Sequence, residues 1–247
     1  MSHSLSIVIP AYNEAPRIGR TLQELSRFLK KEKISAEVIV ADAQSPDGTA
    51  EVALKHRKDF KSLRIYNAGP KPPGKFIKGL QVKKAMLQAK GDIVLFMDAD
   101  LATPLKYIHD AIEQIDSGHD VAICVRNLQK SHTGLRKFVS GFGNFLVQLL
   151  LLPGISDTQC GFKAFSNEAS KVIFPMQTID SWGFDMEILA IARKNGYTIG
   201  IIQVPDWKDV KEGSKIGGTS PIKASLQTFS DLIKIKWRSI RGKYKKK

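Results

Sequence analysis

Three short apolar runs that alternate with helical patterns constrain the fold of this chain more than any other feature of its sequence. The runs cover residues 5–9, 37–41 and 93–97, and β-branched side chains are frequent in them. Apolar residues at helical spacing predict a first helix at 17–33, and further helices are expected at 49–58 and 78–89. Strands that alternate with helices predict βαβ units, and therefore an α/β fold with a mainly parallel central sheet.

The rest of the chain predicts smaller elements and a division into two parts. A fourth strand is expected at 121–125, and a polar loop, a helix and a last strand are expected at 156–163, 185–194 and 198–204. We assign residues 1–205 to one catalytic domain and residues 206–247 to a basic, partly amphipathic helical tail.

The charge of the chain indicates a partner that carries phosphate. It has 38 basic and 24 acidic residues, a formal net charge of +14, and eight of the last 14 residues are Lys or Arg. Such a balance suits nucleic acid, an anionic membrane or a phosphorylated small molecule. A lysine-rich terminus by itself is weak support for nucleic-acid binding, so we expect no nucleic-acid partner.

Cysteine content and hydropathy predict the compartment. Cys124 and Cys160 are the only cysteines, which excludes a disulfide framework and a cysteine-rich metal site and favours a reducing cytoplasm. No secretory signal pattern precedes residue 5, and the longest apolar run, 145–152, is shorter than the about 20 residues that span a bilayer. We therefore expect a protein that contacts the cytoplasmic face of a membrane peripherally.

Unusual residues follow each of the three runs, where the loops of a parallel sheet line the ligand crevice. They lie at 10–14, 42–49 and 98–100. Asp98 and Asp100, one residue apart, could share Mg²⁺ or Mn²⁺, which prefers carboxylate oxygen and bridges to a diphosphate. The metal would stabilise the charge that grows on the leaving group. The alternative is a pair of solvated acids at a strand end.

The order of these motifs resembles that of family 2 glycosyltransferases. Ile-Pro-Ala-Tyr-Asn-Glu at 9–14, Asp42 with Ser-Pro-Asp-Gly-Thr at 45–49, and Asp-Ala-Asp at 98–100 carry the resemblance. The second half is similar to dolichyl-phosphate glucosyltransferases and to enzymes like dolichyl-phosphate mannose synthase. That similarity rests on Asp-Thr-Gln-Cys-Gly-Phe-Lys at 157–163, Trp-Gly-Phe-Asp at 182–185 with Glu187, and Trp207 followed by Gly-Ser-Lys at 213–215.

The resemblance implies a GT-A type nucleotide-sugar-binding fold and a metal-dependent, inverting enzyme. It would move a hexose, expected to be glucose from a UDP-linked donor, to a polyprenyl or dolichyl phosphate. The open alternatives are the same fold acting on a saccharide or another lipid, and a non-catalytic basic protein that binds membrane or nucleic acid.

The resemblance also implies roles for single residues. Asp98, Asp100 and Asp157 are the expected catalytic residues, with Asp98 and Asp100 holding the metal and Asp157 facing the donor sugar or the metal. The nucleotide sugar would be bound by Pro10, Tyr12, Glu14, Asp42, Lys78, Asp98, Gln159, Trp182 and Asp185. The acceptor phosphate would be bound by Arg126, Arg136 and Lys137.

For several of these residues a structural role is the alternative. The nucleoside residues could only shape turns, Trp182 could be part of the core, and the basic residues could be solvated. Glu187 could hold the sugar or be an acid on a helix surface.

The tail carries one more pattern. After Thr219 and Pro221, apolar residues recur at helical spacing at Ile222, Leu226, Phe229, Ile233, Trp237 and Ile240. This stripe could enter the headgroup boundary of a membrane, with the neighbouring lysines on anionic lipid. It could instead dock on the catalytic domain, or do both along its length.

Overall fold

A seven-stranded sheet forms the centre of the molecule. The computed structural model describes residues 3–126, 143, 145–208 and 221–246, the last segment with its side chains from residue 227 onward. The strands are β1 (Leu5–Ala11), β2 (Ala36–Asp42), β3 (Ser62–Asn67), β4 (Ile93–Met97), β5 (Val121–Arg126), β6 (Phe162–Ser166) and β7 (Ile199–Val204). Their spatial order is β3-β2-β1-β4-β6-β5-β7.

Most strand pairs are parallel, which confirms the predicted sheet type. β1 pairs in parallel with β2 and β4, β2 with β3, and β5 with β7. β6 is the exception, because it runs antiparallel between β4 and β5. The carboxyl ends of β1, β2 and β4 therefore meet at one edge of the sheet.

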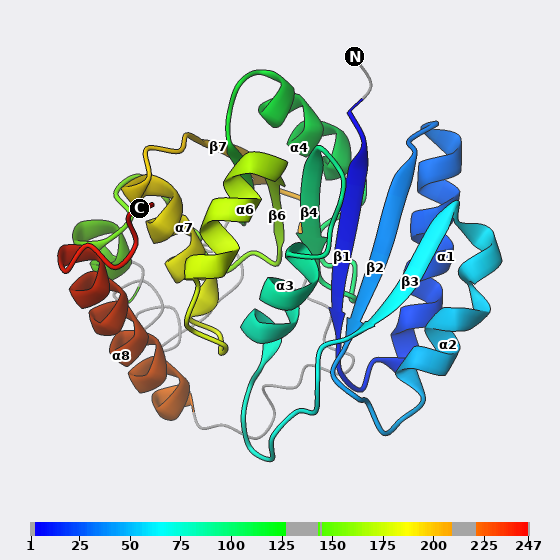
Figure 1. The fold of residues 1–247 in the computed structure, drawn as a ribbon, viewed down its shortest axis with the longest axis horizontal. Coiled ribbons are helices and arrows are strands. Elements are labelled where there is room, and N and C mark those ends of the chain that lie inside the picture. Colours follow the sequence, from blue (N-terminus) through cyan, green and yellow to red (C-terminus); the bar gives the residue numbers. More distant parts are fainter. Residues whose placement is uncertain (1–2, 127–142, 144, 209–220, 247) are drawn as a thin grey trace.

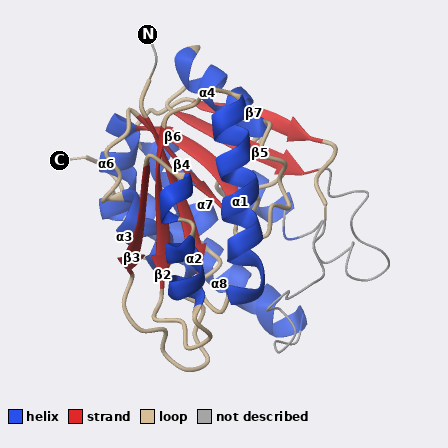
Figure 2. Cartoon of the chain, turned by 90° about the vertical axis from the view of Figure 1, so that its right-hand side faces the viewer, coloured by secondary structure: helices blue, strands red, loops and turns tan. Residues whose placement is uncertain are grey.

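Helices cover both faces of the sheet (Figure 2). They are α1 (Ala15–Lys31), α2 (Thr49–Lys55), the 3₁₀ helix η1 (Arg57–Asp59), α3 (Lys78–Met86), α4 (Tyr107–Asp116), α6 (Asn167–Met176), α7 (Phe184–Lys194) and α8 (Pro221–Ile240). Residues 145–150 are also helical. Buried side chains of α1, α2 and α4 share one core cluster, and those of α3, α6, α7 and α8 share the other.

Successive side chains of a strand lie alternately in these two core clusters. In β4, Val94 and Phe96 lie in the core under α3 and α7, whereas Ile93, Leu95 and Met97 lie in the core under α1 and α4. All five are buried. A strand buried on both faces reads as a continuous apolar run, which is why the sequence marks it clearly.

The structure differs from the predicted elements where the local pattern is weak. The helix predicted at 49–58 ends at Lys55 and continues as η1, and the helix predicted at 78–89 ends at Met86. β3, α4, β6 and α6 were not predicted. β3 is an edge strand with few buried residues, and β6 takes the last two residues of the predicted polar loop 156–163. Short strands of this kind are set by their neighbours in the sheet rather than by their own composition.

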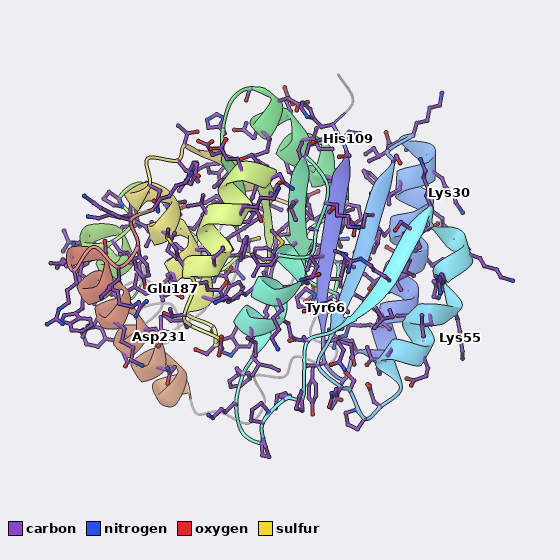
Figure 3. All side chains as sticks on the ribbon, viewed as in Figure 1. Lys30, Lys55, Tyr66, His109, Glu187 and Asp231 are labelled. Atoms are coloured by element: carbon purple, nitrogen blue, oxygen red, sulfur yellow. The ribbon has the colours of Figure 1, made fainter. Side chains whose placement is uncertain are left out.

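The C-terminal helix is built into the domain. Leu232 and Ile235 of α8 are buried, and so is Tyr244 beyond its end. The Tyr244 hydroxyl donates to Glu187 Oε1 of α7 at 2.7 Å. Figure 3 shows Glu187 and Asp231 where α7 and α8 face each other. Of the described residues, none forms a helix long and apolar enough to cross a membrane.

Candidate active site at the carboxyl ends of the strands

Asp98 and Asp100 lie directly after β4, at the edge where β1 and β2 also end. Lys78, the first residue of α3, places its Nζ 2.5 Å from Asp98 Oδ1. Burial alone would lower the pKa of Lys78, but the charges of Asp98, Asp185 and Asp100 raise it. Burial and then the nearby Asp98 carboxylate raise the pKa of Asp100. The site therefore gathers carboxylates around one lysine.

Gly161 allows Asp98 to take its position. The Asp98 backbone N–H donates to Gly161 O at 2.9 Å, which joins the end of β4 to the segment before β6. A Cβ built on Gly161 would lie 2.0 Å from Asp98 Oδ2. No side chain fits there unless the carboxylate moves, so Gly161 belongs to the site, although it was not among the predicted site residues.

Trp182 forms an aromatic wall beside these charges. Its ring centroid lies 5.4 Å from that of Phe76, and Lys78 Nζ lies 5.8 Å from the ring. The side chain is 36% exposed, which rules out the alternative that Trp182 is part of the core. An exposed aromatic face beside charged groups can pack against a sugar ring.

Asp185 lies behind the site rather than on its surface. It is buried and accepts from Lys163 Nζ, which also donates to Cys160 O at 2.6 Å. Burial raises the pKa of Asp185, and the charges of Lys163 and Lys78 oppose that rise. Alternating charges thus lead from Lys163 through Asp185 and Lys78 to Asp98.

The loops after β1 and β2 are joined by hydrogen bonds. Asn13 N–H donates to Ser45 Oγ at 3.0 Å, and Glu14 N–H donates to Thr49 Oγ1 at 2.8 Å. Asp42 is buried and accepts from the hydroxyl and the backbone N–H of Ser45. These contacts hold the two expected nucleoside loops side by side.

Other expected nucleoside residues line the same corner. Pro10 is buried in β1, and Glu14 forms an ion pair with Arg17 Nε at 2.7 Å. Tyr12 is half-buried, with Lys71 Nζ 4.9 Å from its ring centre. Asn13 has a φ of 54°, so this turn needs a residue that tolerates the left-handed region.

Gln81 links the carboxyl ends of β1 and β2. Nothing in the sequence indicated this role. Its Nε2 donates to Ala11 O at 2.6 Å and to Ala41 O at 2.9 Å. The side chain is buried on α3, one turn after Lys78. A glutamine on the buried face of a helix can be recognised as a link between two strands only when the positions of those strands are known.

Arg126 and Asp157 form the other side of the edge. Arg126 Nε and Nη2 donate to Asp157 Oδ2 and Oδ1 at 2.6 and 2.9 Å, and the Arg126 guanidinium lies 5.1 Å from the Trp207 ring. Burial alone would raise the pKa of Asp157, but Arg126 holds it below its ordinary value. Exposed Gln159 donates its N–H to Asp157 Oδ1 at 3.0 Å. Arg136 and Lys137 lie outside the described residues.

Glu187 is neither a sugar ligand nor a surface acid. It is fully buried and accepts from Thr178 N–H, Ile179 N–H and the Thr178 and Tyr244 hydroxyls at 2.6–2.8 Å. Its carboxylate ties α7 to the preceding loop and to the chain end. The tertiary fold supplies these donors, so spacing along the sequence could not reveal them.

The strand-end carboxylates suit a divalent cation. Asp98 and Asp100 supply oxygen atoms only, and both side chains are partly exposed at the edge. Their like charges lie close enough for Asp98 to raise the pKa of Asp100, a repulsion that a cation would relieve. No cluster of three or more His, Cys, Asp or Glu residues able to hold a metal occurs in the described part of the chain. The remaining ligands would then come from water or from a bound diphosphate.

The sheet topology and the two carboxylates at its carboxyl edge fit the GT-A fold of glycosyltransferases. The sequence profile of glycosyl transferase family 2 matches residues 6–174. The chain therefore belongs to glycosyl transferase family 2 and is a glycosyltransferase, which confirms the family, fold and enzyme class predicted from its motifs.

Similar curated proteins include several dolichyl-phosphate beta-glucosyltransferases. The chain is 35% identical to the dolichyl-phosphate beta-glucosyltransferase ALG5A of Trichomonas vaginalis, over 94% of this chain and 72% of that protein. It is 32% identical to the dolichyl-phosphate beta-glucosyltransferase of Dictyostelium discoideum, over 98% of this chain and 76% of that protein.

Solved structures share the fold at lower identity. Glucosyl-3-phosphoglycerate synthase of Mycobacterium tuberculosis, in complex with Mn²⁺, UDP and phosphoglyceric acid, superposes with a TM-score of 0.70 at 20% identity, covering 95% of this chain and 78% of that one. Mannosyl-3-phosphoglycerate synthase of Rubrobacter xylanophilus gives a TM-score of 0.70 at 15% identity, covering 97% and 74%.

Proposed function

We propose that this glycosyltransferase moves glucose from UDP-glucose to a polyprenyl or dolichyl phosphate. The observation that carries the proposal is that Lys78 pairs with Asp98, beside Asp100, at one side of the sheet edge, and that Arg126 pairs with Asp157 at the other. Two separated cationic groups suit two phosphates, one on the donor and one on the acceptor. The names of the curated relatives support glucose as the sugar and dolichyl phosphate as the acceptor.

The donor would bind along the ends of β1, β2 and β4. Tyr12, Glu14 and Asp42 would hold the nucleoside, and Lys78 would lie near the diphosphate. Asp98 and Asp100 would hold Mg²⁺ or Mn²⁺, which supplies Lewis-acid stabilisation of the leaving diphosphate when bound. Trp182 and Gln159 would contact the sugar, and buried Asp185 would orient Lys78 through its charge.

The reaction needs no strong general base. A phosphate monoester has a second pKa of about 6, so the acceptor is largely ionised near neutral pH. An acceptor oxygen forms a bond to the anomeric carbon, the bond from that carbon to the UDP oxygen breaks, and UDP leaves with the electron pair. Displacement from the opposite side inverts the configuration. Lys78 would balance charge on the leaving diphosphate, and catalysis would come chiefly from positioning.

Arg126 is the described residue that we assign to the acceptor phosphate. Asp157 engages its guanidinium in two hydrogen bonds, so we assign Asp157 to positioning Arg126 rather than to a direct contact with sugar or metal. The predicted phosphate contacts of Arg136 and Lys137 stay predictions. We also propose peripheral contact with the cytoplasmic face of a membrane, which the two buried free cysteines and the basic chain end favour.

A donor and acceptor screen tests the proposal. The full chain is incubated with radiolabelled UDP-glucose or GDP-mannose, a polyprenyl phosphate, and Mg²⁺, Mn²⁺ or a chelator. We expect label from UDP-glucose in the organic phase, lost on chelation. Efficient transfer from GDP-mannose with none from UDP-glucose would overturn the donor assignment. A labelled product that partitions into water would favour a saccharide acceptor, and absence of metal-dependent turnover would favour a non-catalytic binding protein.

A further inference from the structure

An apolar stripe on α8 faces away from the domain. The α8 outer face consists of Phe229, Ile233, Trp237 and Ile240, whose spacing of four, four and three residues places them along one side of the helix. Each is between 47% and 73% exposed. A different side of the same helix, with Leu232 and Ile235, is buried against the domain. Docking on the domain therefore leaves these four stripe residues free.

A second helix enlarges this apolar surface. Phe145, Leu149 and Leu150, in the helical residues 145–150, are also exposed, whereas Val147 between them is buried. Lys236 Nζ of α8 donates to Leu150 O at 2.7 Å, so the two helices lie side by side. Figure 1 shows them together at one end of the molecule, on the opposite side from α1 and α2. Seven of the 11 large exposed apolar side chains among the described residues lie on these two helices.

Basic groups border the stripe. Lys236 lies on one side of it, and Arg241 packs its guanidinium 3.8 Å from the Trp237 ring centre. Exposed Lys243, Lys245 and Lys246 follow directly. Among the described residues of α8, Asp231 is the only acid, and it is buried against Gly183 rather than on the outer face. The surface thus combines apolar side chains with a border of positive charge.

We infer that the α8 outer face, with the exposed side chains of residues 145–150, is the surface by which this protein binds an anionic lipid bilayer. An apolar helix face flanked by Lys and Arg lies in the headgroup boundary, with its apolar side chains buried and its cations on anionic lipid. Charge complementarity selects a bilayer over a second copy of this chain, because two copies would bring their basic borders together.

The surface lies next to the site. The Ser181 hydroxyl donates to Asp231 Oδ2 at 3.3 Å, and a Cβ on Gly183 would lie 2.5 Å from the same atom. α8 therefore packs against the turn that carries Trp182. The biological role of this surface rests on the proposed function: with α8 on the bilayer, the candidate site at the carboxyl ends of the strands would lie near a lipid-borne phosphate.

Vesicle binding by surface variants tests the inference without disturbing the core. The full chain and the triple variant Ile233→Ser/Trp237→Ser/Ile240→Ser are sedimented with phosphatidylcholine vesicles, with and without roughly a third phosphatidylserine. We expect the variant to bind anionic vesicles at least about tenfold more weakly. Leu54→Ser, an equally exposed leucine on α2, is the matched control and should bind like the unchanged protein. Arg241→Gln/Lys243→Gln should weaken binding to anionic but not to neutral vesicles.

Each outcome supports or overturns the inference. A folded triple variant that binds anionic vesicles as the unchanged protein does would overturn it. So would a dimer that the triple substitution converts to monomers while vesicle binding stays unchanged, since the face would then join copies of the chain. Transfer to a short, water-soluble acceptor should be unaffected by the triple substitution. Unchanged vesicle binding with intact transfer refutes only this surface, whereas vesicle binding without any sugar transfer refutes only the proposed function.

Discussion

Asp100 lies in the site in an environment that is unfavourable for its negative charge. The nearby Asp98 and partial burial disfavour its charged form, as the raised pKa records. Two carboxylates that repel each other, as Asp98 and Asp100 do, indicate a site where a bound cation or ligand offsets the repulsion. Its neighbour Gly161 is constrained in a different way, by space rather than by charge.

Asp100→Ala should abolish metal-dependent transfer without weakening the fold. Loss of a metal ligand should lower turnover by about a hundredfold or more, since Lewis-acid stabilisation is worth several kcal/mol. The free energy of unfolding should change little, because removing the like-charge repulsion offsets the loss of the hydrogen bond from Ala102 N–H. Mn²⁺ titration, turnover and urea denaturation measure these effects, with Glu113→Ala on the exposed side of α4 as the control. Substantial metal-dependent turnover in Asp100→Ala would refute the metal assignment.

Gly161→Ala should displace Asp98. The added methyl would meet the carboxylate at 2.0 Å, so Asp98 must leave its place beside Lys78. We expect weaker Mn²⁺ and UDP binding, by about tenfold or more, measured by calorimetry. Gly143→Ala is a matched control, because nothing lies within 4 Å of its added Cβ. Equal affinities in both variants would show that the contact does not position Asp98.

At the scale of elements, two pairings lock the second half of the molecule. Arg126 at the end of β5 is bound by Asp157, and Glu187 of α7 binds the chain end through Tyr244. Both carboxylates are buried and accept several hydrogen bonds. Removing one partner of such a pair is costly, since a charge or a polar group is left buried without compensation.

The Arg126–Asp157 pair should make stability depend on acid pH. The folded pKa of Asp157 is lowered, so the carboxylate contributes stability that is complete above the unfolded pKa of about 3.9. That contribution disappears as the pH falls through the lower folded pKa. Asp157→Asn should cost about 3 kcal/mol at neutral pH. Urea denaturation measures the midpoints of Asp157→Asn and of the unchanged protein across the acid range. The difference between the two midpoints should shrink below about pH 4. A difference that does not depend on pH would contradict the pairing.

The Glu187–Tyr244 contact should stabilise the docked chain end. Tyr244→Phe removes one of four donors to Glu187 and should lower the free energy of unfolding by about 1 kcal/mol. Glu187→Ala removes the buried acceptor of all four donors and leaves a cavity beside α7, and should cost at least about 3 kcal/mol. Urea denaturation measures both, again against Glu113→Ala. Equal costs for the two variants would mean that Tyr244 contributes the whole effect.

On the scale of the whole molecule, α8 and the residues after it have one side in the core and the other side on the surface. Leu232, Ile235 and Tyr244 close the core around α7, while the α8 outer face stays exposed. Deleting residues 220–247 should therefore destabilise the domain by roughly 5 kcal/mol or more, since three large side chains lose their burial. A thermal melt of the truncated chain checks this. A truncated chain as stable as the full one would show that α8 adds nothing to the core.

The sequence by itself determined the parallel half of the sheet and the residues at its edge. Runs rich in apolar residues mark β1, β2 and β4, because these strands are buried on both faces. Parallel strands must also end together, which marks the edge of the sheet. Asp98 and Asp100 were placed at that edge for this reason, and Lys78 was added by the family resemblance; the structure pairs Lys78 with Asp98. Gly161 and Gln81 were not found, since each acts on atoms far away along the chain.

Only the tertiary structure decided which groups are buried and which faces remain free. Asp185 and Glu187 look alike in sequence, yet one faces Lys163 behind the site and the other binds the chain end, because burial on α7 depends on its neighbours. The stripe on α8 was readable from its helical period. Which side of that helix docks was not, since periodicity gives the relative positions of side chains on a helix but not the surface against which the helix packs.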